Sequence, residues 1–215
     1  MIIIMNKIFD RKISGWRGVS YFLLLSFLLI SYTACTEEVE EEGDFDNWLA
    51  RNEAVITEWG SSSAFMKFKS YTKDQTSTGS SSDYVYVKVQ ESGSGTESPL
   101  FNDTIRVAYR LYYVPTKTYP QGYVVSETFT GTFNWNTIGV SDFVLSGSMI
   151  DGFCTAVLNM HVGDRWIVNI PYPLGYGNPS TRSDIYSGSN LIYDLALVDF
   201  WHPGETRPTF RARQK

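Results

Sequence analysis

The side chains that most often carry enzyme chemistry are few and scattered in this chain. His161 and His202 are the only histidines, and we do not expect them to converge on a metal. Cys154 lies among apolar residues, so we interpret it as a buried core thiol rather than a nucleophile. A glycine-rich phosphate loop is absent, and the spacing of the aspartates does not require a carboxylate pair. We therefore expect neither a metal nor a cofactor.

Residues 141–193 instead hold apolar and aromatic residues at spacings typical of strands and a helix. A short apolar run at 143–145 is typical of a strand, and residues 149–160 place apolar side chains at helical spacing. Alternation over 166–170 predicts a half-buried strand. The Pro- and Gly-rich loop at 171–179 carries two tyrosines, which makes this loop a candidate site.

Four motifs in this stretch resemble, in order and spacing, those of the FKBP-type peptidyl-prolyl cis-trans isomerases. They are M-I-D-G-F at 149–153, L-N-M-H-V-G-D at 158–164, I-P followed by L-G-Y-G within 170–177, and S-N-L-I-Y at 189–193. The resemblance covers about residues 84–200. It implies an α+β fold, a twisted antiparallel sheet wrapped around one α-helix, and the strand, helix, strand order favours the same class. We place the helix at 150–161, with Phe153 and Val157 facing the sheet.

The activity that the resemblance implies acts on proline-containing polypeptides and needs no ionisable catalyst. The barrier to rotation about a peptide bond is about 18–20 kcal/mol and comes from amide resonance. An apolar, aromatic-lined pocket can take the X–Pro bond out of water and favour its twisted form. A donor to the imide carbonyl assists.

The resemblance also assigns roles to individual residues. The expected catalytic residues are Tyr109, Ile150, Phe153 and Tyr176, and the expected substrate-binding residues are Val125, Ser126, Met149, Ile185 and Tyr193. Phe153 takes the place of the family's tryptophan floor, while the Ile150 N–H and the Tyr176 hydroxyl are the expected donors. We assign three further apolar residues, Phe143, Leu158 and Trp166, to the core.

Two departures from the family pattern leave the activity open. Val125 stands where the family has a pocket phenylalanine, and Ser126 where it has an aspartate. These changes predict lower catalytic efficiency or a different sequence preference. One alternative is therefore a degenerate FKBP-fold binding module or chaperone. Another is a surface lipoprotein that binds glycans or proteins, suggested by the aromatic content of 15% and an acidic N-terminal segment.

Residues 1–35 are typical of a targeting segment. A basic stretch precedes the apolar run at 21–30, which is shorter than the roughly 20 residues that a membrane span needs. Small residues before Cys35 resemble a bacterial lipobox, although Tyr32 replaces the usual leucine. We expect lipidation of Cys35 and anchoring to the cell envelope, on its periplasmic or surface side. The alternative is ordinary cleavage that leaves Cys35 as a thiol, and we do not expect a disulfide with Cys154.

Residues 36–83 are expected to hold an acidic tether, a short helix and a Ser/Thr-rich linker. The tether is either a plain spacer or an export signal resembling that of Bacteroidetes-type surface lipoproteins. Apolar spacing predicts the helix at 46–59, with Asp46 as its cap and Gly60 as its stop. An FKBP-like domain is then expected at 84–202 and a basic tail at 203–215. A net charge of −5 argues against nucleic acid as a partner, and we expect a monomer.

Overall fold

The computed structural model describes residues 43–210, which belong to one compact unit starting at Gly43. The expected targeting segment, Cys35 and most of the acidic tether lie outside the described residues, as do the last five residues of the basic tail. In the described part, no helix is long and apolar enough to cross a membrane.

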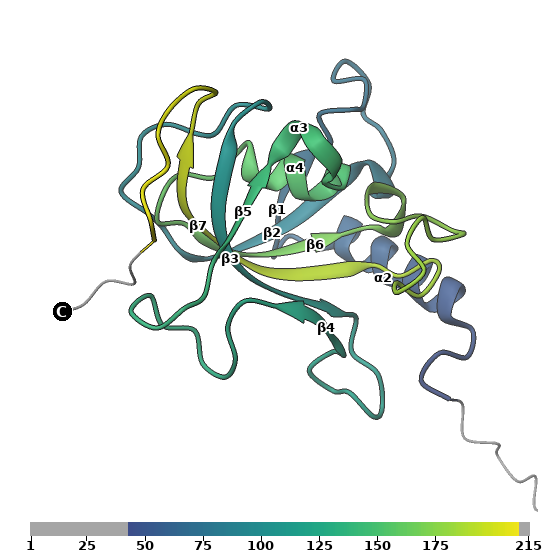
Figure 1. Ribbon diagram of the computed structural model, residues 1–215. Coiled ribbons are helices and arrows are strands. Elements are labelled where there is room, and N and C mark those ends of the chain that lie inside the picture. Colours follow the sequence, from purple (N-terminus) through teal and green to yellow (C-terminus); the bar gives the residue numbers. More distant parts are fainter. Residues whose placement is uncertain (1–42, 211–215) are drawn as a thin grey trace, which may run out of the picture. The chain divides into compact units, whose positions relative to one another are not determined.

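The elements follow one another as expected for an α+β chain, with several strands on either side of a short helix (Figure 1). In order they are α2 Trp48–Ser61, β1 Met66–Lys69, η1 Ser81–Asp83, β2 Tyr84–Glu91, β3 Thr104–Tyr113, β4 Val124–Glu127, β5 Ser141–Val144, α3 Leu145–Ser148, α4 Asp151–Val157, β6 Arg165–Ile170, η2 Tyr172–Leu174 and β7 Leu191–Trp201. The predicted fold class is confirmed: one antiparallel sheet carries helix α4.

The sheet has the order β1-β2-β6-β7-β3-β4, and β5 also pairs with β3. Strand β3 pairs along its whole length with β7. Its other edge is divided, because β5 pairs with residues 104–107 and β4 with residues 110–112. Tyr109 lies between these two partners, and there Thr128 completes the edge: Tyr109 N–H donates to Thr128 Oγ1 at 2.9 Å and Thr128 N–H donates to Tyr109 O at 2.8 Å.

Helix α4 packs against this sheet through an apolar surface that is almost completely buried. Phe153 and Val157 are buried as predicted. Gly152 permits the close approach of the helix, because a Cβ atom there would lie 2.3 Å from Ile170 Cγ2. The helix is shorter than the predicted 150–161. Leu158 N–H still donates to Cys154 O, and the N–H groups of Asn159 and Met160 then donate to residues three positions back, so Met160 lies in a turn.

Helix α2 is fixed to the loop before β7 by buried polar contacts. Trp48 Nε1 donates to Ser189 Oγ at 2.9 Å. The Asn190 side chain donates to Asn52 O at 2.7 Å, and Asn190 N–H donates to Asn52 Oδ1 at 2.8 Å. Both asparagines are completely buried, so their mutual bonds satisfy groups that would otherwise be costly to bury. The helix thereby holds the loop that carries Tyr176.

Both predicted ends of helix α2 need correction. Asp46 does not cap it: the N-cap is Asn47, and Asp46 Oδ2 accepts from Gly43 N–H at 2.7 Å. Gly60 does not stop it either, since the helix runs to Ser61. Gly60 is required for a different reason, because a Cβ atom there would lie 2.3 Å from Ser81 Oγ.

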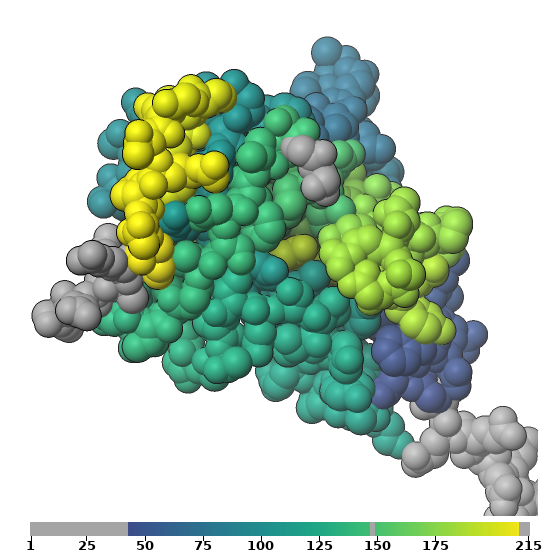
Figure 2. All heavy atoms as spheres, in the orientation of Figure 1, coloured from purple at the N-terminus to yellow at the C-terminus, as the bar shows by residue number. Residues whose placement is uncertain are grey.

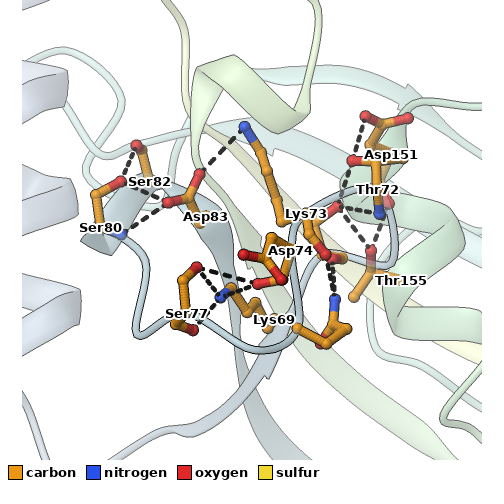
Figure 3. Close-up of polar contacts among 12 residues, drawn as sticks. Lys69, Thr72, Lys73, Asp74, Ser77, Ser80, Ser82, Asp83, Asp151 and Thr155 are labelled. Carbon is orange, nitrogen blue, oxygen red and sulfur yellow. Dashed lines mark hydrogen bonds and ion pairs between the residues drawn. The ribbon is translucent and has the colours of Figure 1, made fainter.

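The stretch 61–83, predicted as a loose connection, contains strand β1 and the helical turn η1. Its loop is tied down by polar contacts (Figure 3). Asp83 accepts from Ser80 N–H at 2.7 Å and pairs with Lys73 at 3.1 Å. Thr72 Oγ1 donates to Asp151 Oδ2 on α4 at 3.0 Å. Strand β1 escapes prediction because it is short and alternates lysine with apolar residues at an exposed edge.

The opposite face of the sheet carries a second, smaller apolar cluster. Residues 128–140 and the C-terminal segment supply most of its members, which pack on Ala108 and Ala196 of the two central strands. Its buried and half-buried side chains are Phe129, Phe133, Trp135, Ile138, Val140, Val198 and Phe210. Both faces of the central strands are therefore covered, but only the face with α4 carries the expected site.

Candidate active site

The expected site residues gather at a cavity of about 540 Å³ beside the divided edge of β3. Figure 2 shows this hollow between the green helical segment and the yellow-green loop, with the colour of β7 at its floor. The side chains that line it are Tyr109, Leu111, Ser126, Phe143, Met149, Ile150, Phe153, Tyr176, Thr181, Arg182 and Tyr193. We call this cavity the aromatic bowl.

Four aromatic rings from three strands and α4 form the inner surface of the bowl. Phe153 and Tyr193 meet edge-on with centroids 5.4 Å apart, and Phe143 lies 6.4 Å from Phe153. Tyr109 lies 6.0 Å from Tyr193 and 6.1 Å from Phe143. Tilted and edge-on contacts at these distances are the favoured arrangements of aromatic rings, so each ring holds its neighbours in place. The result is an ordered, largely apolar inner surface for the cavity.

Strand pairing brings two hydroxyls together at the wall. Ser126 of β4 lies opposite Leu111 of β3, and its Oγ atom is 3.0 Å from Tyr109 Oη. A serine thus stands where a carboxylate would be within reach of the same tyrosine. Burial is the main cause that raises the pKa of Tyr193, followed by the neighbouring Tyr176 and Tyr109. The Tyr193 hydroxyl therefore stays neutral, and the wall of the bowl carries no fixed charge.

At the rim, Tyr176 is engaged by a cation that the sequence reading did not include. Arg182 Nη1 donates to Tyr176 Oη at 3.2 Å, and its guanidinium lies 5.1 Å from the centre of the ring. Asp184 holds this arginine through two hydrogen bonds and so raises its pKa. Because Arg182 donates to the phenol oxygen, the Tyr176 proton remains free to be donated to a ligand. The hydrogen bond from Arg182 also polarises the Tyr176 hydroxyl, which makes it a stronger donor.

Backbone contacts set the position of Tyr176. Thr181 N–H donates to Tyr176 O at 2.8 Å, and Gly177 N–H donates to Tyr172 O at 2.9 Å. Tyr172 N–H in turn donates to the buried Asn190 side chain at 2.9 Å. The rim is therefore connected through Asn190 to helix α2, which the sequence analysis placed outside the domain.

Seven of the nine expected site residues line the bowl, and two do not. Val125 is the extra residue of a bulge, since Leu111 pairs with Ser126 and Tyr112 with Val124. It packs against the core and does not line the bowl. Ile185 is buried and lines a neighbouring cavity.

The bowl also includes residues that the sequence analysis missed. Phe143, assigned there to the core, is only half-buried and lines the bowl. Arg182 was not singled out, although an arginine and an aspartate two residues apart in a loop beside Tyr176 were a usable signal. Trp166 is buried in the core as predicted.

The chemistry that the bowl can supply is desolvation with a few donors at its edge. Ile150 lies at the start of α4, and none of the hydrogen bonds found among residues 43–210 is donated by its N–H. Nor do three or more His, Cys, Asp or Glu side chains in this range gather where they could hold a metal ion. An apolar ring could enter the bowl while an adjoining carbonyl accepts from Ile150 N–H or the Tyr176 hydroxyl.

Comparisons with known proteins place this geometry in a family. Residues 95–198 match the family model of FKBP-type peptidyl-prolyl cis-trans isomerases. Peptidyl-prolyl cis-trans isomerase FKBP9 of Homo sapiens is 32% identical over 93 residues, which cover 43% of this chain and 15% of that protein. FK506-binding protein 1A of Neurospora crassa is 27% identical over 116 residues, which cover 54% of this chain and 88% of that protein. The chain spans only 15% to 21% of the length of the FKBP9 relatives that it matches.

Solved structures show the same fold. A peptidyl-prolyl cis-trans isomerase from Pseudomonas syringae superposes with a TM-score of 0.52 at 16% identity, covering 74% of this chain and 97% of that one. FkpA from Escherichia coli superposes with a TM-score of 0.51 at 19% identity, covering 86% and 72%. At these identities the likeness concerns the fold alone, and the family match comes from the sequence. Residues 95–198 are therefore a domain of the FKBP-type peptidyl-prolyl cis-trans isomerase family.

Proposed function

We propose that this chain catalyses cis-trans isomerisation of X–Pro bonds in polypeptides. The observation that carries the proposal is the bowl of four interlocked rings, Tyr109, Phe143, Phe153 and Tyr193, with hydroxyl and N–H donors at its edge. A pyrrolidine ring fits such a surface, and its removal from water favours the twisted imide, which has lost the resonance that polarises the planar form.

In this mechanism the chain positions the substrate and does not transfer a proton. The proline ring packs on Phe153, and the carbonyl of the X–Pro bond or its neighbour accepts from Ile150 N–H. The Tyr176 hydroxyl, held by Arg182, supplies a second donor at the rim. Because the inner wall of the bowl carries no charge and Arg182 lies at the rim, the transition state is stabilised by shape and by these two donors.

The test is turnover of proline tetrapeptides by purified residues 36–215, measured by a cis-to-trans assay. We expect acceleration over the uncatalysed rate that is lost in Phe153→Ala. A folded wild-type protein that leaves the rate unchanged would refute the proposal. A second function then takes precedence, a binding module or chaperone with the FKBP fold. The observation in its favour is Ser126, which faces Tyr109 where a carboxylate would strengthen the contact. Suppression of aggregation of an unfolded protein without turnover would support it.

The proposed setting is the cell envelope, where the chain would assist folding of exported proteins as a monomer. The support is confined to residues 1–46: a short apolar run, small residues before Cys35, and acidic residues after it. Intact mass of the mature protein should show added acyl groups on Cys35. If a Cys35→Ala form still fractionates wholly with membranes, the lipid anchor is refuted.

A further inference from the structure

A second cavity, of about 680 Å³, lies next to the aromatic bowl. Aromatic side chains from three separate segments form it: Phe45 before α2, Tyr119 and Tyr123 before β4, and Tyr186 in the loop before β7, with Tyr113 of β3 beneath. We call these five residues the aromatic shelf. In Figure 2 the corresponding dark-blue, teal and yellow-green segments meet at one side of the hollow.

The rings of the shelf are held in place yet remain accessible. Tyr123 stacks on Tyr113 at 6.0 Å and meets Tyr119 edge-on at 5.1 Å, while Phe45 lies 4.7 Å from Tyr186. Tyr119, Tyr123 and Tyr186 are nevertheless 38%, 44% and 50% exposed. Grouped apolar exposure of this kind on a surface is typical of a binding site. Rings that are already ordered lose little conformational freedom when a ligand binds.

The shelf continues the bowl along one face of the sheet. Tyr109 and Leu111 line the bowl, and Tyr113, the next residue on the same face of β3, lies under the shelf. The pairing of β3 with β7 is regular over these residues, so Tyr109 and Tyr113 are about 13 Å apart at roughly 3.3 Å per residue. The loop 181–187 borders both cavities. An extended polypeptide covers the same distance with about four residues.

We propose that the shelf is a second subsite for an extended polypeptide, which places an aromatic or large apolar side chain there, about four residues from the proline in the bowl. This inference rests on the proposed function, because the proline in the bowl sets the register. A polypeptide fits better than a glycan, since two polar side chains of the lining that could bind sugar hydroxyls, Asp184 and Ser187, are already engaged. Asp184 is bound by Arg182, and Ser187 Oγ accepts from Ser180 N–H at 3.0 Å.

Binding of labelled peptides, followed by fluorescence anisotropy, tests this subsite in the full chain. The probes are the tetrapeptide Ala-Ala-Pro-Leu and ten-residue extensions of it that carry tryptophan, or serine as a control, three to five residues from the proline on either side. We expect one tryptophan position to bind about five- to tenfold tighter than its serine counterpart. The pair Tyr119→Ser and Tyr123→Ser should abolish this preference and change tetrapeptide binding less than twofold.

Two further variants separate the ring from its hydroxyl and from general surface effects. The pair Tyr119→Phe and Tyr123→Phe should keep the preference, because it keeps the rings. Phe101→Ser is the matched control: this phenylalanine is 43% exposed and lines neither cavity. A preference that survives the serine pair, or that no tryptophan position shows, overturns the inference. The inference is also overturned if the serine pair loses binding to soluble malto- or cello-oligosaccharides but keeps the peptide preference. That result would identify a glycan site.

Turnover of the tetrapeptide, measured in parallel, separates this inference from the proposed function. Wild-type protein that shows the tryptophan preference without turnover keeps the subsite and refutes the isomerase. Wild-type protein with turnover but without preference at any position keeps the isomerase and refutes the subsite.

Discussion

The two faces of the central strands are both rich in aromatic rings, but they differ in how many charged side chains contact those rings. In the bowl, four rings contact one another, the hydroxyls of Tyr109 and Ser126 lie 3.0 Å apart at the wall, and the cation Arg182 lies at the rim on Tyr176. On the opposite face, three arginines each lie over an aromatic ring and bind an acid. The pairs are Arg106 with Asp142, Arg110 with Glu127, and Arg165 with Asp194.

The difference shows which rings are available to a ligand. The guanidinium of Arg165 lies 4.2 Å from the centre of the Phe133 ring, that of Arg106 lies 4.7 Å from Trp201, and that of Arg110 lies 4.7 Å from Phe129. These rings already have a cation over one face, and each cation has its counterion. A cavity of about 530 Å³ on this face, lined by Arg106, Trp135 and Phe210 among others, is therefore bordered by charged groups. The four inner rings of the bowl contact one another, and the guanidinium of Arg182 lies over Tyr176 at the rim, which leaves the inner rings as a surface for an apolar ligand. The predictions below test this division, from the largest expected effect to the smallest.

Phe153→Ala should have the largest effect, because this ring is 1% exposed and joins the bowl to the core. Removing a buried phenylalanine costs about 3–5 kcal/mol of unfolding free energy. Urea denaturation should show this loss, and turnover per folded molecule should fall as well. A variant of wild-type stability would mean that the floor of the bowl is not part of the core.

Arg106→Met should destabilise the opposite face without affecting the bowl. It removes both hydrogen bonds to Asp142 and the one to Pro208 O, at 2.7, 2.8 and 2.8 Å. Since Asp142 is partly exposed, we expect a loss of about 1–3 kcal/mol of unfolding free energy with unchanged tetrapeptide turnover per folded molecule. Adding Asp142→Leu should recover part of the loss. Reduced turnover in the folded protein would show that the two faces are coupled.

Features of these regions that depend on neighbouring residues in the sequence could be predicted, and features that depend on contacts between distant segments could not. Strand β6 was predicted because apolar and polar residues alternate in it, and β5 because a short apolar run marks it. Strand β1 was missed because its short, lysine-rich edge gives little signal. The helix was drawn too long because Met160 keeps helical spacing after the backbone has turned.

The same limit applies to the candidate site. Seven lining residues were named from motifs, because strand and helix positions follow from local order. The places of Arg182, Phe143 and Val125 were not predicted, since they depend on a loop conformation, on which face of β5 is turned inward, and on a bulge in β4. Such features are set by pairing between distant segments, which periodicity does not report.

Tyr176→Phe should reduce activity while leaving the fold intact. It removes one hydroxyl, the hydrogen bond that this hydroxyl accepts from Arg182, and little volume. A net hydrogen bond is worth about 0.5–1.5 kcal/mol, which corresponds to about a two- to tenfold fall in kcat/KM. An unchanged kcat/KM for the tetrapeptide would remove Tyr176 from the mechanism.

Ser126→Asp tests whether an absent charge limits the bowl. A carboxylate within reach of Tyr109 Oη would make a charge-assisted bond in place of the present hydroxyl contact of 3.0 Å. The gain of about 1 kcal/mol should raise kcat/KM about fivefold, and Ser126→Asn is the uncharged control. If Ser126→Asp and Tyr176→Phe both leave turnover unchanged in folded protein, the bowl is not the active site. The binding module then becomes the better account.

The smallest effect should be a pH dependence that appears in stability and not in turnover. His202 Nδ1 lies 2.8 Å from the buried Asp103 carboxylate, and this contact, with smaller contributions from Glu205 and Glu97, raises the pKa of His202 above its usual value of 6.5. Because His202 binds its proton more tightly in the folded state, protonated His202 stabilises the fold. This stabilisation is complete below about pH 6.5 and is lost as the pH rises through the folded-state pKa. The effect is small because solvent screens the interaction of the imidazole, whose side chain is 45% exposed.

The difference in unfolding free energy between wild type and His202→Gln, measured from pH 5 to 9, should therefore shrink as the pH rises. Tetrapeptide kcat/KM should stay level over the same range, because the wall of the bowl carries no charge and burial raises the pKa of its Tyr193. A bell-shaped rate profile near neutrality would place a titrating group in the mechanism and remove the distinction between the uncharged inner wall of the bowl and the charged opposite face of the sheet.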